Sequence, residues 1–288
     1  MKVRKAVILA AGYGTRFLPA TKAVPKEMLP LVDRPVIQYI VEEAVAAGLH
    51  HIVMVTSAPK RSIEDYFDRE PGLEQTLAQR GKHDALRELV ELTTIADFAF
   101  VRQKERLGNG HAVLITRNLV GQEPFALFFP DDVIVHEVPA TRQLLDVYEK
   151  TGATVVAVQE VAPAEVEHYG VIDPEPVSDR LYRVKGIIEK PRREEATSNL
   201  ATVGRFVLTP RIFDVLAQTP PGREGELWLM DALHRLAQEE PVYAYQYEGE
   251  RFDTGRPMGL LKASIALALR REDLGPELKA YLKSLRLT

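Results

Sequence analysis

The chain has 288 residues, of which 45% are hydrophobic and 27% charged, proportions typical of a globular protein with its own core. Its 37 basic and 41 acidic side chains give a net charge of −4, which argues against a nucleic-acid polymer or an anionic membrane as partner. The lack of cysteine excludes disulfides, thiolate metal sites and a cysteine nucleophile. The first apolar run is too short for a secretion signal or a membrane span, so we expect a cytoplasmic protein.

Apolar runs typical of buried strands alternate with helical patterns. Strands are expected at 6–10, 51–57, 97–101, 125–129, 153–161 and 202–208. Helices are expected at 35–48, 61–92, 109–119 and 256–287. Because this alternation favours parallel pairing, we predict a Rossmann-like α/β fold: a mixed, mainly parallel sheet flanked by helices, with a helical C-terminal appendage. We expect one α/β domain over 1–255, with 256–288 packing on it or on a partner subunit.

The stretch VILAAGYGTRFLPATKAVPKEMLP (7–30) leads from the first strand into a glycine-containing turn. It is not a dinucleotide fingerprint, because the third glycine is replaced by Phe17, and the chain contains no P-loop sequence. Small residues that would let backbone N–H groups approach an anion follow the strand: Ala10, Ala11, Gly12 and Gly14. Arg16 could bind a phosphate through two hydrogen bonds, and Lys26 lies in a loop stiffened by prolines. The turn therefore predicts a phosphate-binding site.

Two acids end the apolar strand in FALFFPDDV (125–133). Paired carboxylates at the edge of an open sheet are costly unless a cation neutralises them, and Mg²⁺ prefers such hard oxygen ligands. Since successive residues of an extended chain point in opposite directions, one acid of the pair is expected to face the site. Asp253, in FDTGRP (252–257), follows another strand and is a candidate for a second carboxylate ligand.

The stretch LAAGYGTRFLPATKAVPKEMLPLVDRPVIQY (9–39) resembles the signature of the sugar-1-phosphate nucleotidyltransferases, and in particular their uridylyl branch. The likeness covers most of the chain. It implies the nucleotidyltransferase fold and the transfer of a uridylyl group from UTP to glucose 1-phosphate, giving UDP-glucose and pyrophosphate with Mg²⁺ as cofactor. In-line attack by an already ionised sugar phosphate needs neither a general base nor a covalent intermediate.

The resemblance assigns roles to residues in several further stretches. RQKERLGNGHAV (102–113) is similar to the stretch that reads the nucleobase, so Gln103 is expected to match the donor and acceptor edge of uracil, with Gly108 close to the base. HYGVID (168–173), VKGIIEKP (184–191) and SNLATVGRFVL (198–208) resemble the sugar-binding stretches. The residues implied for sugar binding are Gly170, Glu189 and Asn199.

Charged residues complete the implied mechanism. Arg16 and Lys26 would neutralise the triphosphate, and Lys190 would hold the sugar phosphate. Asp131 and Asp253 would bind Mg²⁺, while Asp132 would face away. His111 is interpreted as structural, because the reaction does not require it as a base.

The sequence departs from the family pattern at a few positions. Asn109 stands where relatives usually have leucine, and Trp228 and Met230 replace a glutamine and a threonine in PGREGELWLMDAL (221–233). The change at Asn109 concerns a helix start and is expected to be tolerated. Trp228 and Met230 alter either the packing of their helix or the edge of the sugar pocket, so a non-catalytic nucleotide-sugar sensor stays an alternative. So do dTTP and galactose 1-phosphate as substrates, although an insertion at 70–96 favours the uridylyl branch. A homodimer or homotetramer is expected.

Overall fold

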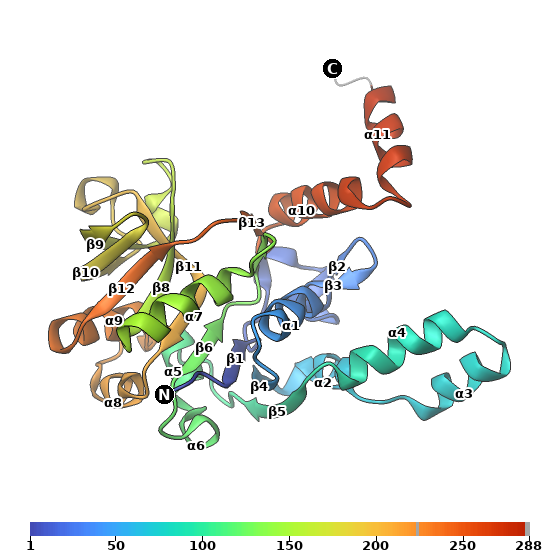
Figure 1. Ribbon diagram of the computed structural model, residues 1–288, viewed down its shortest axis with the longest axis horizontal. Helices are drawn as coiled ribbons and strands as arrows, with labels where there is room; N and C mark the ends of the chain where they lie inside the picture. Colours follow the sequence, from blue (N-terminus) through green and yellow to red (C-terminus); the bar gives the residue numbers. More distant parts are fainter. Residues whose placement is uncertain (223–224, 286–288) are drawn as a thin grey trace.

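The computed structural model describes residues 1–222 and 225–285, so positions 223–224 of the PGREGELWLMDAL stretch and positions 286–288 of the C-terminal segment lie outside the described residues. A nine-stranded sheet forms its centre, in the order β5–β4–β1–β6–β11–β8–β12–β10–β9 (Figure 1). Its strands are β1 Lys5–Leu9, β4 His51–Thr56, β5 Asp97–Arg102, β6 Phe125–Phe128, β8 Thr154–Glu160, β9 Gly170–Ser178, β10 Leu181–Glu189, β11 Leu200–Leu208 and β12 Val242–Gln246. Two further antiparallel pairs form separate small sheets: β2 Pro30–Leu31 with β3 Arg34–Pro35, and β7 Asp132–Val135 with β13 Glu250–Asp253.

The sheet is mixed, which confirms the predicted α/β fold, although parallel pairs do not predominate as expected. Strands β5, β4, β1 and β6 run parallel to one another, as do β8 and β12. Strand β11 is antiparallel to β6 and β8, and β10 is antiparallel to β9 and β12. The short connection between β9 and β10 has no room for a crossover helix, so these two strands must pair as a hairpin.

Helices cover both faces of the sheet. They are α1 Val36–Ala46, α2 Arg61–Phe67, α3 Pro71–Gln79, α4 His83–Thr94, α5 Asn109–Leu114, α6 Arg117–Val120, α7 Ala140–Thr151, α8 Arg211–Gln218, α9 Leu229–Glu239, α10 Pro257–Arg270 and α11 Gly275–Ser284. One hydrophobic cluster joins the sheet to α1, α2 and α7, and another joins its opposite face to α5, α8 and α9. Because the strands are apolar on both faces, they bury side chains in both clusters.

Two parts of the chain stand out from this body. The insertion at 70–96 forms the α3–α4 hairpin, which extends away from the sheet and contains no buried residue (Figure 1). Helix α10 packs against β13 and β2, with Ala263 buried, whereas α11 contacts α10. The division into a 1–255 domain and a C-terminal segment stays a prediction. None of the helices within the described ranges has the length and apolar character needed to cross a membrane.

Candidate active site

The first cavity, of about 530 Å³, opens beyond the carboxyl ends of β1 and β6. This is the edge of an open α/β sheet where ligands are expected to bind. The cavity brings together seven residues that the sequence singled out: Ala11, Gly12, Gly14, Lys26, Gln103, Gly108 and Asp131. Ala10 does not fit the expectation that its backbone N–H approaches a phosphate. It is fully buried, and its N–H donates to the Val55 carbonyl at 2.8 Å, so it has no free donor for a phosphate.

The glycine turn holds Lys26 close to the first strand. Gly14 has φ +70°, and a Cβ there would stand 3.0 Å from Cβ of Lys26, so a larger residue would push the lysine away. The Lys26 ammonium donates to Asp131 Oδ2 at 2.8 Å. The next residue, Glu27, is buried and bound to the Lys60 ammonium at 2.6 and 2.7 Å, which fixes the loop on the other side. Lys26 is therefore held in place, as its position between prolines indicated.

Gln103 is bound more tightly than the sequence suggested. Its amide nitrogen donates to the Gly108 carbonyl at 3.0 Å and lies 3.1 Å from His111 Nδ1. Because the carbonyl can only accept, these contacts fix the amide and leave its Oε1 as the group available to a base. The expected donor-and-acceptor match to uracil is therefore corrected to a single acceptor. His111 has the structural role assigned to it, since it orients Gln103.

No residue with a side chain fits at the position of Gly108 without a collision. Its φ is +95°, and a Cβ would stand 2.4 Å from the Leu227 carbonyl. Asn109 begins α5, and its Oδ1 accepts a hydrogen bond from the N–H of Leu229, the first residue of α9, at 2.8 Å. The asparagine that departs from the family pattern thus caps a neighbouring helix, which gives the departure a structural reason.

The second cavity, of about 230 Å³, adjoins the first and shares Asp131 with it. It brings together the other expected residues: Arg16, Gly170, Glu189, Lys190 and Asp253. Burial raises the pKa of the Glu189 carboxyl, although the neighbouring Lys190 opposes this. Asn199 does not line either cavity, and its backbone carbonyl accepts from Val161 at 3.0 Å. The structure therefore does not bring Asn199 to the site.

Asp131 and Asp253 meet through the pairing of β7 with β13. A Cβ on Gly255 would stand 2.9 Å from Asp131 Oδ2 and 3.0 Å from Asp253 Oδ1, so both carboxylates face the same small space. The backbone N–H of Thr254 donates to the Asp131 carbonyl at 2.7 Å, which locks the two segments together. Burial alone would raise the pKa of Asp131, but the Lys26 ammonium outweighs it and lowers that pKa. The pair could hold a divalent cation.

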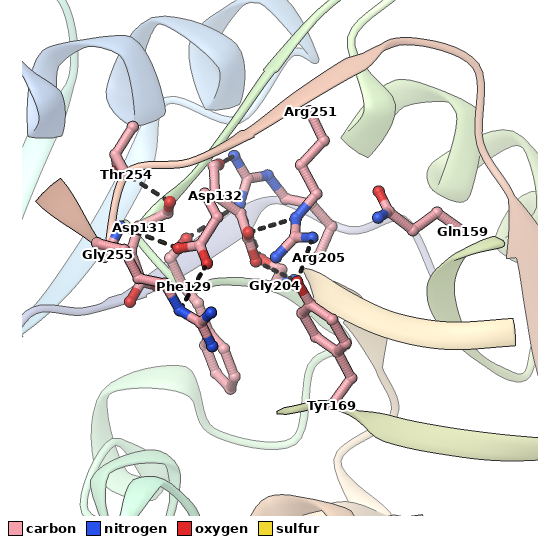
Figure 2. A network of polar contacts seen from close by, with 12 residues as sticks. Phe129, Asp131, Asp132, Gln159, Tyr169, Gly204, Arg205, Arg251, Thr254 and Gly255 are labelled. Atoms are coloured by element: carbon pink, nitrogen blue, oxygen red, sulfur yellow. Dashed lines mark hydrogen bonds and ion pairs between the residues drawn. The ribbon is translucent and has the colours of Figure 1, made fainter. Parts of the chain in front are cut away.

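The Asp132 carboxylate is bound by a neighbouring arginine side chain and a backbone N–H (Figure 2). Its oxygens accept from Arg251 Nε at 2.5 Å and from the N–H of Gly204 at 2.8 Å. The Arg251 guanidinium also lies over the Tyr169 ring, 5.0 Å from its centroid, beside the expected sugar-binding residue Gly170. These contacts hold the Asp132 carboxylate in place, but the residue also lines the second cavity, so the division of roles between the two acids stays a prediction.

A buried arginine, which the sequence analysis missed, supports the same loop. The Arg205 side chain is fully buried and binds both carboxylate oxygens of Glu43, with contacts of 2.7 to 3.0 Å. It also donates to the carbonyls of Phe129 at 3.2 Å and Asp132 at 2.6 Å, on either side of Asp131 (Figure 2). Arg205 lay within the quoted stretch 198–208, but nothing in that stretch marked it as buried.

Arg106 was also missed. Its guanidinium lies 3.4 Å above the centroid of the Tyr13 ring and donates to the Ala11 carbonyl at 3.2 Å. It lines the first cavity and places a positive charge beside the glycine turn. Its position between Gln103 and Gly108 was the signal that could have found it, since both neighbours were already candidates.

The fold and the site define a nucleotide-binding α/β protein whose two cavities meet at a carboxylate. The nucleotidyl transferase family model matches residues 5–269, and the chain belongs to this family. It is similar to UTP–glucose-1-phosphate uridylyltransferase 2 of Staphylococcus saprophyticus (49% identical over 99% of both chains) and to UTP–glucose-1-phosphate uridylyltransferase of Staphylococcus epidermidis (48%, again 99% of both).

Solved structures agree with these relatives. A UDP-glucose pyrophosphorylase complexed with UDP-glucose is 43% identical, with a TM-score of 0.86 over 93% of this chain and all of that one. A UTP-bound structure from Acinetobacter baumannii is 39% identical, with a TM-score of 0.91 over 99% of this chain and all of that one. The family resemblance read from the glycine turn is thereby confirmed.

Proposed function

We propose that this chain transfers the uridylyl group of UTP to glucose 1-phosphate, giving UDP-glucose and pyrophosphate. The observation that carries the proposal is the position of Asp131, which lines both cavities and faces the same space as Asp253. A nucleotide in the first cavity and a sugar phosphate in the second would meet at this carboxylate. The full-length similarity to uridylyltransferases supports the choice of substrates.

The first cavity suits the nucleotide. The base would lie against Gln103 and Gly108, where Gln103 Oε1 can accept from the N3–H of uracil. The phosphates would lie along the glycine turn. There Gly12 and Gly14 would let backbone N–H groups approach the phosphates, and Arg106 would supply a positive charge. Since thymine carries the same N3–H, Gln103 does not separate UTP from dTTP.

The carboxylates of Asp131 and Asp253 fit a divalent cation, which we propose to be Mg²⁺. The fit rests on two hard oxygen donors facing one space, and on the ammonium of Lys26, which places a positive charge against Asp131. Within the described ranges no group of three or more His, Asp or Glu side chains forms a metal site, so phosphate oxygens and water would complete the coordination. When bound, the ion would neutralise charge on the phosphates at the reacting centre.

The residues of the chain would act by positioning and neutralisation. Lys190 would orient an oxygen of the sugar phosphate toward the α-phosphorus of UTP, and Lys26, in the first cavity, would neutralise the leaving group. Arg16, which was expected at the triphosphate, lines the second cavity and would neutralise phosphate charge from that side. As the new phosphorus–oxygen bond forms, the bond between the α-phosphorus and its bridging oxygen breaks and pyrophosphate leaves with that electron pair. The nucleophile is already ionised, so no side chain has to remove a proton.

Substrate pairing tests the proposed function. Pyrophosphate release is measured with Mg²⁺ and each of UTP and dTTP, paired with glucose 1-phosphate or galactose 1-phosphate. We expect release mainly with UTP and glucose 1-phosphate. Release mainly with another pair would overturn the substrate assignment but keep the chemistry. Nucleotide binding without release from any pair would instead indicate a sensor.

Replacing Gly108 with alanine tests the proposed base site. The added Cβ would collide with the Leu227 carbonyl and displace the carbonyl that holds Gln103. We expect the KM for UTP to rise about tenfold or more, because a misplaced Gln103 costs roughly one hydrogen bond to the base. The KM for glucose 1-phosphate should change little in the same steady-state measurements.

Gly121→Ala is the matched control. Gly121 also has a positive φ, +74°, but no atom lies within 4 Å of its Cβ position and it lines neither cavity. Both variants should lose about 1–3 kcal/mol of stability from backbone strain. An unchanged KM for UTP in Gly108→Ala, or an equal rise in Gly121→Ala, would contradict the proposed base site.

We further propose that the protein acts in the cytoplasm and that it self-associates. The C-terminal helices support self-association, since Met258, Leu261 and Tyr281 are 61%, 53% and 59% exposed. Sedimentation of the wild type and of Leu261→Glu tests this. We expect the variant to sediment as a smaller species, and identical sedimentation would argue against these helices as the interface.

A further inference from the structure

Trp228, the only tryptophan of the chain, contacts the cation proposed to hold the sugar phosphate. The Lys190 ammonium lies 4.4 Å from the centroid of the indole ring, within the range of a cation–π interaction. Lys190 directly follows β10 with φ +48°, an unusual conformation for a residue with a side chain. The local backbone thus directs this lysine, and the indole ring receives its charged end.

Trp228 and the two carboxylates line different cavities, and Lys190 lines both of them. Lys190 lines both the second cavity, with Asp131 and Asp253, and a third cavity of about 530 Å³. Trp228 lines the third cavity but not the second. The indole therefore contacts the lysine from the third cavity, whereas Asp131 and Asp253 lie in the second. Lys190 thus lies at the boundary between the two cavities, with Trp228 as a partner for its ammonium.

The ring itself is fixed by packing. A Cβ on Gly222 would stand 3.7 Å from Trp228 Cδ1, so the edge of the indole rests on the turn that precedes α9. Within the described ranges the buried indole nitrogen has no hydrogen-bond partner, so no hydrogen bond sets the angle of the ring. Trp228 also occupies the N-cap position of α9, which ties the ring to the start of a buried helix.

An aromatic face is a suitable partner for a cation that must bind a phosphate. Glu189 lies 3.7 Å from the same ammonium, a longer contact than the 2.8 Å between Lys26 and Asp131, so it is the looser of the two ion pairs. The indole stabilises the ammonium without carrying a formal negative charge. A phosphate can then bind Lys190 without displacing a strong ion pair.

We propose that Trp228 is a positioning residue that holds Lys190 against the sugar-phosphate site through a cation–π contact. The inference rests on the proposed function, because it assigns Lys190 to glucose 1-phosphate. It extends that function by naming the residue that keeps the cation in place. A purely structural tryptophan would affect stability but would not act selectively on one substrate.

Steady-state kinetics of two variants test the proposal. Trp228→Leu keeps apolar bulk but removes the aromatic face, whereas Trp228→Phe retains an aromatic ring. We expect Trp228→Leu to raise the KM for glucose 1-phosphate about tenfold while the KM for UTP stays within about twofold, as befits a partly desolvated cation–π contact. Trp228→Phe should recover most of the affinity. Equal KM values for glucose 1-phosphate in the leucine variant and the wild type would overturn the proposal.

Fluorescence provides a readout that does not depend on turnover. Since Trp228 is the only tryptophan, tryptophan emission reports on the surroundings of this one ring, which include Lys190. We expect Lys190→Met to change the emission without ligand, and UDP-glucose to shift the emission of the wild type but not of this variant. Identical emission of the two proteins, with and without UDP-glucose, would overturn the contact. An inactive wild type whose emission still behaves as expected would count against the proposed function rather than against the contact.

Discussion

The Asp131→Asn variant is expected to fold normally and to lose about a thousandfold or more in kcat, equivalent to roughly 4 kcal/mol of transition-state stabilisation. Asp131 is the carboxylate that both cavities share, and it faces the same space as Asp253. Asparagine keeps the shape of the side chain but removes the negative charge that would bind the metal ion and pair with Lys26. Pyrophosphate release at saturating substrates, measured over a range of Mg²⁺ concentrations, checks this expectation.

Asp132→Asn is the matched control, because it makes the same chemical change one residue away. Asp132 holds Arg251 and the backbone of Gly204, so its loss should mainly lower the free energy of unfolding. We expect this variant to unfold at lower urea concentration and to keep much more activity than Asp131→Asn when folded. If the two variants lost kcat equally and both remained folded, the assignment of the metal site to Asp131 would be wrong.

The second large effect is expected at Arg205. Replacing it with leucine leaves the buried Glu43 carboxylate without its partner and leaves the Phe129 and Asp132 carbonyls without a donor. Breaking a buried ion pair by removing one partner typically costs about 3–5 kcal/mol. Urea unfolding followed by circular dichroism should show a loss of this order. Because the free energy of unfolding of a native protein is only about 5–15 kcal/mol, a loss of this order would remove a large part of it.

A double-mutant cycle separates the ion pair from other effects of the substitution. Glu43→Gln alone should also destabilise the protein, because it leaves the Arg205 charge buried without its counter-charge. The double variant should lose less than the sum of the single losses, since neither partner then remains charged and unpaired. Additive losses would show that Arg205 stabilises the protein through its other contacts.

Much of the fold could be predicted because its signals are local. The apolar runs at 6–10, 51–57 and 97–101 each form a strand within one residue of the expected bounds. The helical region expected at 61–92 resolves into α2, α3 and α4, and Pro71 begins the second of these. The antiparallel half of the sheet was harder to predict, because pairing partners such as β11 and β6 are far apart in sequence.

The residues of the candidate site also fall into those that local motifs predict and those that depend on contacts between distant segments. The glycine turn, Gln103 and Asp131 could be found from short motifs, and the structure brings them to one cavity. Asp253 could be named as a candidate, but its meeting with Asp131 depends on the pairing of β13 with β7.

Contacts between distant segments account for what the sequence did not predict. Arg205 reaches Glu43, 162 residues away in the chain, and nothing in the local sequence distinguishes such a buried arginine from an exposed one. The hydrogen bonds that fix the Gln103 amide depend on side-chain orientation, which residue spacing does not determine. Asn199 is the opposite case: its stretch matches the family motif, but the residue lines neither of the two cavities of the site.

The most direct test of the central claim is isotope exchange between labelled pyrophosphate and UTP, with Mg²⁺ and with or without glucose 1-phosphate. Direct attack of the sugar phosphate on UTP predicts that label enters UTP only when glucose 1-phosphate is present, because reversal then requires UDP-glucose. Label entering UTP without the sugar phosphate would reveal a covalent uridylyl intermediate and contradict the mechanism. No exchange under either condition would contradict the proposed reaction itself.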